Sequence, residues 1–236
     1  MKNQEKLTEK NAVQTYRRIR KAVGCLGISL PIALLLLSLI PFFKTDVQSS
    51  ISSYYYTNFR EVMTGTLCAV SLFLIRYKSS ENTVFLKDDD TMTNIAGVLA
   101  LGVALFPTNP ECCSQKIYTL VPICSKYLGW VHYFFAASFF LILAEISIVV
   151  FTIGQKKSKK IPLSYLNENN IYKGCGIAII AFTIMLLICG LFNLFPYSTL
   201  IFETLALWAF GISWLVKGRV LGDKGRIGRT LYREKH

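Results

Sequence analysis

The chain has 236 residues, of which 53% are hydrophobic and 17% are charged. A soluble domain of this size normally carries about a quarter charged residues, so the composition indicates a membrane protein without a separate soluble domain. The formal net charge of +12 would also suit a nucleic-acid-binding protein. The basic residues, however, lie in tails and loops with few interleaved aromatic residues, so no nucleic acid is expected among the partners.

Six apolar stretches are predicted to cross the membrane, because about 20 apolar residues span the hydrocarbon core of a bilayer. Three of them reach that length readily, and the other three need residues from their flanks. They cover 22–43, 61–76, 92–107, 129–153, 174–195 and 199–216. The sequence thus predicts an all-α fold, a polytopic membrane helical bundle of six transmembrane helices with short loops and one longer external loop at 108–128.

The basic residues predict the orientation of these helices. Of the 26 Lys and Arg residues, only four fall in the segments on one side of the membrane, and the positive-inside rule makes that side external. Both termini are then cytoplasmic, with a basic segment at 1–21, the transmembrane domain at 22–216 and a basic tail at 217–236. The external segments hold no Asn-x-Ser/Thr sequon, which fits the cytoplasmic (inner) membrane of a bacterium.

The external segment 44–60 carries three consecutive tyrosines, Tyr54, Tyr55 and Tyr56. Two interpretations stay open: the tyrosines belong to the aromatic belt at the level of the lipid headgroups, or they form a lid over a cavity. Arg60 and Glu61 follow at the outer mouth of the second helix. There they pair with each other or reach the headgroup of a ligand.

The third predicted helix places Ala96, Ala100 and Ala104 four residues apart. Small residues at that spacing allow helix backbones to approach closely, so this face is predicted to form a tight contact between helices. Three aspartates, 88–90, precede the helix. They rarely converge on one ion from adjacent positions and are instead predicted to favour the helix N-terminus through their charge.

Three cysteines fall in the long external loop, namely Cys112, Cys113 and Cys124. In an oxidising compartment such as the periplasm, we expect a disulfide from Cys124 to Cys112 or Cys113, with one thiol left over. The other four cysteines lie in apolar stretches, where they act as small hydrophobic residues.

The fourth and sixth helices both run inward from the outside, which brings their polar residues to a similar depth. His132 lies in the first turns of the fourth helix, and Glu203 lies near the outer end of the sixth. Ionisable groups at such depth are costly unless they face protein or water. Together with Arg60, Glu61 and the tyrosines, they either bind one another between helices or line a cavity that opens outward.

The first function that we expect is binding of a membrane lipid or small amphiphile in that outward-facing cavity, without catalysis. Arg60 would contact an anionic headgroup, and His132 and Glu203 would make polar contacts. The alternative is a membrane-embedded enzyme acting on lipid, with His132 and Glu203 as acid and base and with Ser52 or Ser53 as nucleophile. A transporter or an accessory subunit of a membrane complex is a further alternative, so an oligomer or a partner protein stays open.

No metal and no other cofactor is expected. A catalytic zinc ion needs three protein ligands. His132 is the only histidine within the predicted helices, since His236 is the last residue.

Several of these residues together resemble a known family. They are the run Ser53-Tyr-Tyr-Tyr-Thr with Arg60, the Leu-Phe-Pro-Thr that ends the third helix, His132, and Glu203 with the later Phe-Gly-Ile-Ser-Trp-Leu-Val-Lys-Gly. Over residues 22–218 the chain resembles a widespread family of uncharacterised six-helix bacterial membrane proteins, catalogued as a domain of unknown function. Its layout more distantly resembles the Frag and DRAM group, some of which are linked to lipid handling. The resemblance implies a lipid-related role and assigns no residues.

Overall fold

The computed structural model describes residues 2–77, 88–109, 126–153, 167–192, 194–222 and 231–232. Within these ranges the chain forms helices and no strand, which confirms the all-α prediction. The α-helices are α1 (Lys2–Ser38), α2 (Arg60–Arg76), α3 (Asp89–Leu105), α4 (Lys126–Ile148), α5 (Glu168–Phe192) and α6 (Ser198–Lys217). Short 3-10 helices are η1 (Pro41–Phe43), η2 (Ser52–Tyr56) and η4 (Val150–Thr152).

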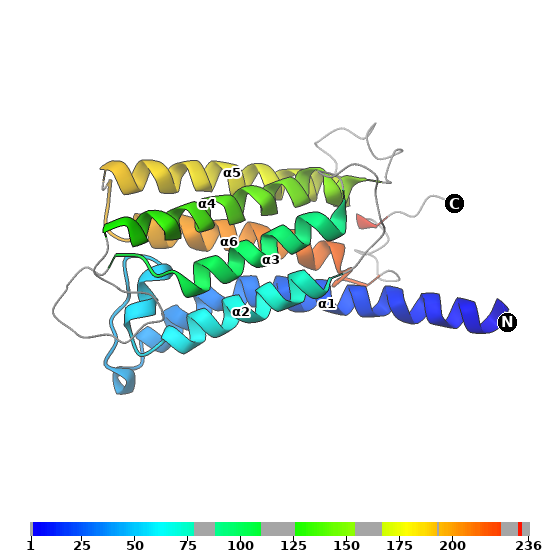
Figure 1. Ribbon diagram of the computed structural model, residues 1–236, viewed down its shortest axis with the longest axis horizontal. Helices are drawn as coiled ribbons and strands as arrows, with labels where there is room; N and C mark the ends of the chain where they lie inside the picture. The colour runs from blue at the N-terminus through cyan, green and yellow to red at the C-terminus, as the bar shows by residue number, and fades with distance from the viewer. Residues whose placement is uncertain are drawn as a thin grey trace.

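The six α-helices run side by side along the long axis of the molecule (Figure 1). Each packs against the next along the chain, and α1 also packs against α6, which closes the bundle. Both chain termini lie at one end of it (Figure 1), which we call the terminal end. The opposite end, where α1 ends and α6 begins, we call the distal end.

Four of the helices are long and apolar enough to cross a bilayer, at 11–38, 129–152, 168–192 and 198–217. The other two, α2 and α3, have 17 residues each. At about 1.5 Å per residue they are roughly 25 Å long, slightly less than the roughly 30 Å of hydrocarbon in a typical bilayer. The structure therefore shows four helices of spanning length and apolarity beside two shorter ones.

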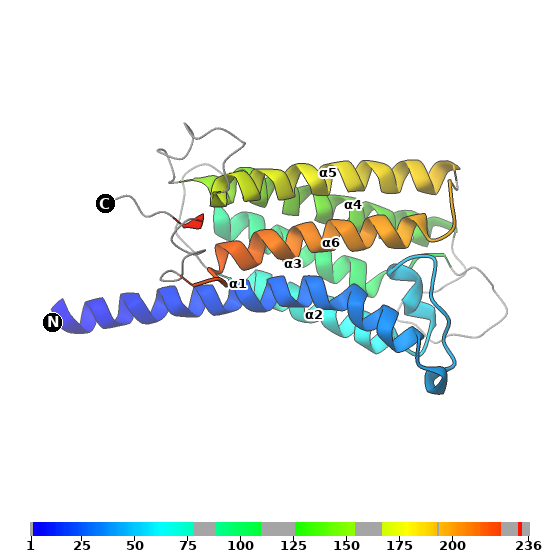
Figure 2. The same cartoon turned by 180° about the vertical axis from the view of Figure 1, so that it is seen from behind.

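The first helix differs from the expected boundary at residue 22. It is one continuous helix of 37 residues, and Pro31 lies inside it without ending it. The basic segment 1–21 is therefore part of the same helix, and α1 extends past the rest of the bundle at the terminal end (Figure 2). The apolar run marks only part of α1, because lysine and arginine are also good helix formers and continue the helix through the basic segment.

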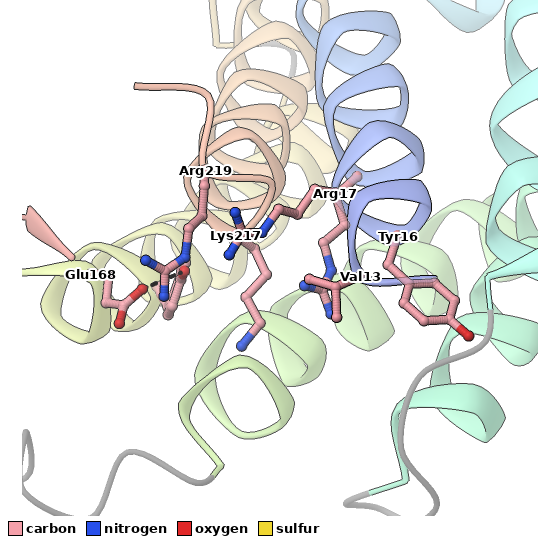
Figure 3. A pocket seen from close by; sticks show the side chains of 8 residues that line it. Val13, Tyr16, Arg17, Glu168, Lys217 and Arg219 are labelled. Carbon is pink, nitrogen blue, oxygen red and sulfur yellow. Dashed lines mark hydrogen bonds between the residues drawn. The ribbon is translucent and has the colours of Figure 1, made fainter. Parts of the chain in front are cut away.

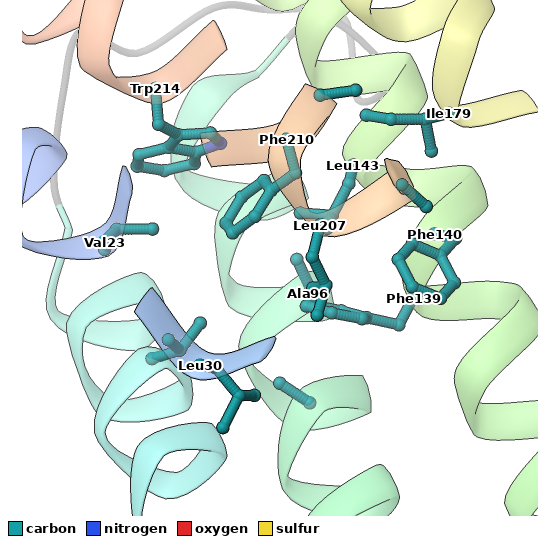
Figure 4. Packing of buried hydrophobic residues seen from close by; sticks show 14 of the residues in the cluster. Val23, Leu30, Ala96, Phe139, Phe140, Leu143, Ile179, Leu207, Phe210 and Trp214 are labelled. Atoms are coloured by element: carbon teal, nitrogen blue, oxygen red, sulfur yellow. The ribbon is translucent and has the colours of Figure 1, made fainter. Parts of the chain in front are cut away.

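The core is built around α6, whose Phe210 and Trp214 are almost wholly buried between α1, α3 and α4 (Figure 4). The predicted alanine face of α3 is confirmed as buried, with exposed fractions of 0%, 0% and 1% for Ala96, Ala100 and Ala104. The α1–α6 contact is also close. A Cβ atom on Gly24 would lie 2.8 Å from the carbonyl oxygen of Gly211, and one on Gly211 would lie 2.8 Å from that of Gly24.

The aspartates before α3 act at its N-terminus as predicted. Asp88 is the residue before the first turn, and its side chain accepts a hydrogen bond of 2.9 Å from the backbone N–H of Thr91. This satisfies one of the N–H groups that the first turn leaves without an intrahelical partner. Asp89, the first residue of the helix, is buried and faces another side chain, described below.

Candidate functional site

The distal end is covered by the segment 44–59, which we call the distal cap. Its residues fold onto the bundle: Tyr54 is fully buried, and Ile51 and Phe59 are only 5% and 2% exposed. The hydroxyl group of Tyr54 lies 2.9 Å from Ser38 Oγ at the end of α1. The tyrosine run is thus packed inside the protein, with Tyr55 also buried and Tyr56 partly buried.

His132 joins the distal cap to α3 and α4. Its Nδ1 atom lies 2.6 Å from the carbonyl oxygen of Phe106, and its Nε2 atom lies 2.9 Å from Ser52 Oγ. Because a carbonyl oxygen only accepts, Nδ1 carries the proton, and in the neutral ring Nε2 accepts from the serine hydroxyl. His132 is 2% exposed, so both of its bonds are shielded from solvent.

Glu203 binds a different part of the distal cap. Its Oε2 atom accepts a 2.5 Å hydrogen bond from the backbone N–H of Ile51. The backbone N–H of Leu200 donates to the carbonyl oxygen of Ser49 over 3.0 Å, which joins α6 to the cap a second time. His132 and Glu203, which the sequence predicts to lie together, therefore both contact the distal cap. Each forms hydrogen bonds with groups of the protein.

The remaining predicted residues lie nearer the surface. Arg60 and Glu61 form an ion pair, one of the two arrangements predicted for them, with 3.3 Å between Nη2 and Oε1 and with side chains that are 36% and 74% exposed. The guanidinium of Arg60 lies 5.9 Å from the centre of the Tyr55 ring. The cysteines expected to form a disulfide, Cys112, Cys113 and Cys124, lie outside the described residues.

Tyr56 makes the stability of the distal cap sensitive to alkaline pH. Its hydroxyl group donates to the carbonyl oxygen of Thr108, and burial, with a smaller contribution from Tyr55, raises its pKa to about 12. Between pH 10 and pH 12 the folded state then holds a proton that the unfolded chain has lost, so stability falls as pH rises through this window. We expect Tyr56→Phe to lessen that fall.

The measurement is the unfolding temperature in detergent at pH 9 and pH 11, for the wild type and for Tyr56→Phe. Tyr127→Phe is the control, because Tyr127 is 80% exposed. Equal pH dependence in all three proteins would contradict the assignment to Tyr56.

A cavity of about 280 Å³ lies at the terminal end, between α1 and α5 and against the end of α6 (Figure 3). We call it the terminal pocket. Among the described residues, its lining holds four cationic residues and one carboxylate, together with Val13, Tyr16 and Tyr172. The charged residues are Arg17, Arg20, Lys217, Arg219 and Glu168.

Lys217 lies in the middle of this group, between Arg17 on one side and Arg219 with Glu168 on the other (Figure 3). Its Nζ atom donates to the carbonyl oxygen of Phe151 over 2.8 Å and lies 5.1 Å and 5.4 Å from the rings of Phe151 and Tyr172. These contacts hold the ammonium group of Lys217 against the protein, although the residue ends an apolar helix. Carbonyl and aromatic faces are the groups that stabilise a partly buried ammonium ion.

Arg20 forms the wall of the pocket toward α3. Its guanidinium lies 3.7 Å from Asp89 Oδ2 and 5.1 Å from the centre of the Tyr77 ring. The Tyr77 hydroxyl accepts from Arg20 and donates to Asp89 over 2.9 Å. The three side chains connect α1, the end of α2 and the start of α3, so this wall is fixed by charge-assisted bonds.

Sequence reasoning missed the terminal pocket. Its basic residues were counted only as indicators of orientation, because they lie about 200 positions apart in the chain and the α1–α6 contact joins them. One signal was present. Arg17 and Arg20 are three residues apart, so they share one face of a helix, and Lys217 and Arg219 directly follow an apolar helix.

The all-helical bundle, with four helices long and apolar enough to cross a bilayer, is that of an integral membrane protein. The comparisons with known proteins add no closer assignment. No family model, no curated protein and no solved structure matches the chain. The resemblance to the six-helix bacterial family stays a prediction.

Proposed function

We propose that the protein is an integral membrane protein of six crossings that binds the anionic headgroup of a membrane lipid in the terminal pocket. The observation that carries this proposal is the convergence of four cationic side chains, from two distant parts of the chain, on one cavity whose described lining holds one carboxylate. Such a cavity favours a negatively charged ligand, because a negative charge relieves the repulsion among the cations.

The position of the terminal pocket favours a lipid as that ligand. It lies where α6 ends at Lys217 and α5 begins at Glu168, the level at which an apolar helix leaves the hydrocarbon for the headgroup layer. The basic residues of the chain gather on this side, so we place both termini and the pocket in the cytoplasm, at the inner membrane of a bacterium. The inner leaflet there would supply anionic lipid.

The outward-facing cavity expected at the distal end stays a prediction. The contacts of His132 with Ser52 and of Glu203 with Ile51 favour the other interpretation, in which these residues join segments of the protein. The proposed ligand is thus still a lipid, as in the hypothesis from the sequence, but its headgroup is proposed to bind at the terminal end of the bundle and not at the distal end. Roles as an enzyme, a transporter or an accessory subunit also stay predictions.

The test is lipid binding to the purified protein in mild detergent, measured by native mass spectrometry. Wild type is expected to hold an anionic phospholipid in preference to phosphatidylcholine with the same chains. Arg17→Gln and Lys217→Met should each weaken binding by about tenfold or more, since a hydrogen bond to a charged group contributes about 1.5–3 kcal/mol.

Two variants are needed because Lys217 also donates to the Phe151 carbonyl oxygen. Replacing Lys217 can therefore disturb the structure as well as lipid binding, and Arg17→Gln tests lipid binding without removing that contact. Lys173→Met is the matched control. It removes the same charge from α5, one residue after Tyr172, at a position outside the pocket lining. If both pocket variants bind anionic lipid as the wild type does, the proposed function is wrong.

A further inference from the structure

Two residues of the C-terminal tail, Leu231 and Tyr232, pack against the bundle. Each is 3% exposed, and both belong to the buried apolar cluster of the protein. They lie at the terminal end, where Figure 1 draws them in red. The sequence predicts a basic cytoplasmic tail at 217–236 and contains no pattern that indicates this contact. Part of the tail is thus built into the end of the bundle.

Tyr232 touches the terminal pocket through Arg219. The centre of its ring lies 4.9 Å from Cζ of the Arg219 guanidinium. Arg219 is one of the described residues that line the cavity, whereas Tyr232 is not. An aromatic face attracts a guanidinium group, and more strongly where water is excluded. Tyr172, on the α5 side of the cavity, also interacts electrostatically with Tyr232. Tyr232 therefore lies behind one of the pocket cations.

The backbone at Arg219 is held in an unusual conformation. Helix α6 ends in a Schellman motif, in which the N–H of Arg219 donates to the Val216 carbonyl oxygen over 2.9 Å and the N–H of Val220 donates to that of Leu215 over 3.1 Å. Arg219 has the left-handed φ of 54° that this motif requires. Glycine usually occupies the position, because a side chain there is strained. Here an arginine occupies it, and its side chain extends from the end of α6 toward Glu168 (Figure 3).

The position of the Arg219 guanidinium matters for a bound anion because Coulomb attraction weakens with distance. An arginine side chain has many rotamers, and fixing it in one of them costs conformational entropy. The ring of Tyr232 offsets that cost on the side of the guanidinium that faces the tail. The charge of Arg219 is then kept at the cavity before any ligand arrives.

We propose that Tyr232 is a positioning residue of the terminal pocket, whose ring holds the guanidinium of Arg219 at the cavity. The C-terminal tail is then part of the lipid site. This inference rests on the proposed function and adds to it a residue that does not itself touch the headgroup.

Replacing the ring by an aliphatic side chain tests this role. Tyr232→Leu keeps an apolar group in the buried position and removes the aromatic face. We expect it to weaken binding of phosphatidylglycerol by about two- to fivefold, the factor that corresponds to one cation–π contact. Tyr232→Phe keeps the ring and should bind like the wild type. Tyr127→Leu is the control, because Tyr127 is 80% exposed and lies outside the described lining of the pocket.

A double variant separates positioning from a general loss of structure. Arg219→Gln alone should weaken binding by about tenfold, since it removes one charged partner of the headgroup. If Tyr232 acts through Arg219, adding Tyr232→Leu to Arg219→Gln changes binding no further. If Tyr232 acts only through the fold, the two losses multiply. The lipid bound to the purified full chain is counted by native mass spectrometry, with phosphatidylcholine of the same chains as reference.

The outcomes distinguish this inference from the proposed function. The inference alone is overturned if Tyr232→Leu binds phosphatidylglycerol as the wild type does, if Tyr232→Phe binds as weakly as Tyr232→Leu, or if the losses multiply. A wild type without preference for phosphatidylglycerol over phosphatidylcholine would overturn the proposed function as well.

Linkage provides a second measurement, which does not depend on how Tyr232→Leu folds. If the packed tail favours headgroup binding, a bound headgroup favours the packed tail by the same factor. Saturating phosphatidylglycerol should therefore slow the removal of Tyr232 by a carboxypeptidase about two- to fivefold, compared with phosphatidylcholine in the same detergent. Arg219→Gln should lose this protection. Digestion at the same rate in both lipids, or protection that persists in Arg219→Gln, would contradict the inference.

Discussion

Replacing Gly211 with alanine is expected to destabilise the protein by about 1–3 kcal/mol, the usual cost of overpacking a well-packed core. The new Cβ atom would lie 2.5 Å from Ile28 Cγ1 and 2.8 Å from the carbonyl oxygen of Gly24. The second contact is with backbone, so a rotamer change cannot relieve it. The gain in helix propensity, about 1 kcal/mol for glycine to alanine, offsets only part of this cost.

The control is Gly190→Ala in α5, where a Cβ atom would meet nothing within 4 Å. At this position the change only raises the helix propensity and creates no close contact, so the protein should become slightly more stable. The measurement is the unfolding temperature of both variants in the same detergent, with Gly24→Ala as a replicate from the α1 side of the contact. If Gly211→Ala has the same unfolding temperature as Gly190→Ala, the close approach of α1 to α6 is contradicted. The geometry of the terminal pocket, which depends on that contact, is then contradicted too.

Replacing His132 with alanine is expected to loosen the distal cap. The change leaves the Phe106 carbonyl and the Ser52 hydroxyl without their present partner in a site where the histidine was 2% exposed. An unsatisfied buried polar group costs about 1–3 kcal/mol, and contacts of this kind in membrane proteins average somewhat less than 1 kcal/mol. Taking about 1 kcal/mol for each of the two groups, where the two ranges meet, we expect a total loss of about 2 kcal/mol, together with faster proteolysis within residues 44–59.

Tyr133→Ala is the matched control, because this neighbouring residue has a larger side chain but is 54% exposed. It should change the unfolding temperature less than His132→Ala does. If His132→Ala has no effect on unfolding or on proteolysis, the contact with Ser52 does not hold the cap. Stoichiometric labelling of Ser52 by an alkyl fluorophosphonate would instead favour the enzyme interpretation, in which His132 activates that hydroxyl group.

The helices could be located from the sequence because apolar runs and charged residues coincide with their limits. The second helix was predicted at 61–76 and spans Arg60–Arg76. The third begins at Asp89, three residues before the expected start, because the Asp88 side chain caps the first turn through Thr91. The unexpected length of α1 has a similar origin. Its first half is too polar to be recognised as a membrane span, yet its residues have a high helix propensity.

The sites were harder to predict because they depend on packing between distant segments. The sequence predicts His132 and Glu203 at one depth, and in the structure both side chains bond to neighbouring residues of the distal cap, Ser52 and Ile51. Counting charges on each side of a membrane gives orientation and conceals local clusters. Whether Lys217 extends to the surface or turns toward the Phe151 carbonyl depends on η4 and α5, which no local pattern around Lys217 reveals.

The location of the bound headgroup tests the central claim most directly. An anionic phospholipid analogue with a photoreactive diazirine close to the phosphate would be cross-linked to the protein in bilayer nanodiscs, and the modified residues would be identified by peptide mass spectrometry. Cross-links should fall on α1 around Tyr16 and on α5 around Tyr172, and Arg17→Gln should weaken them. Cross-links confined to the distal cap and to α4 near His132 would contradict the terminal pocket and favour a headgroup site at the opposite end of the bundle.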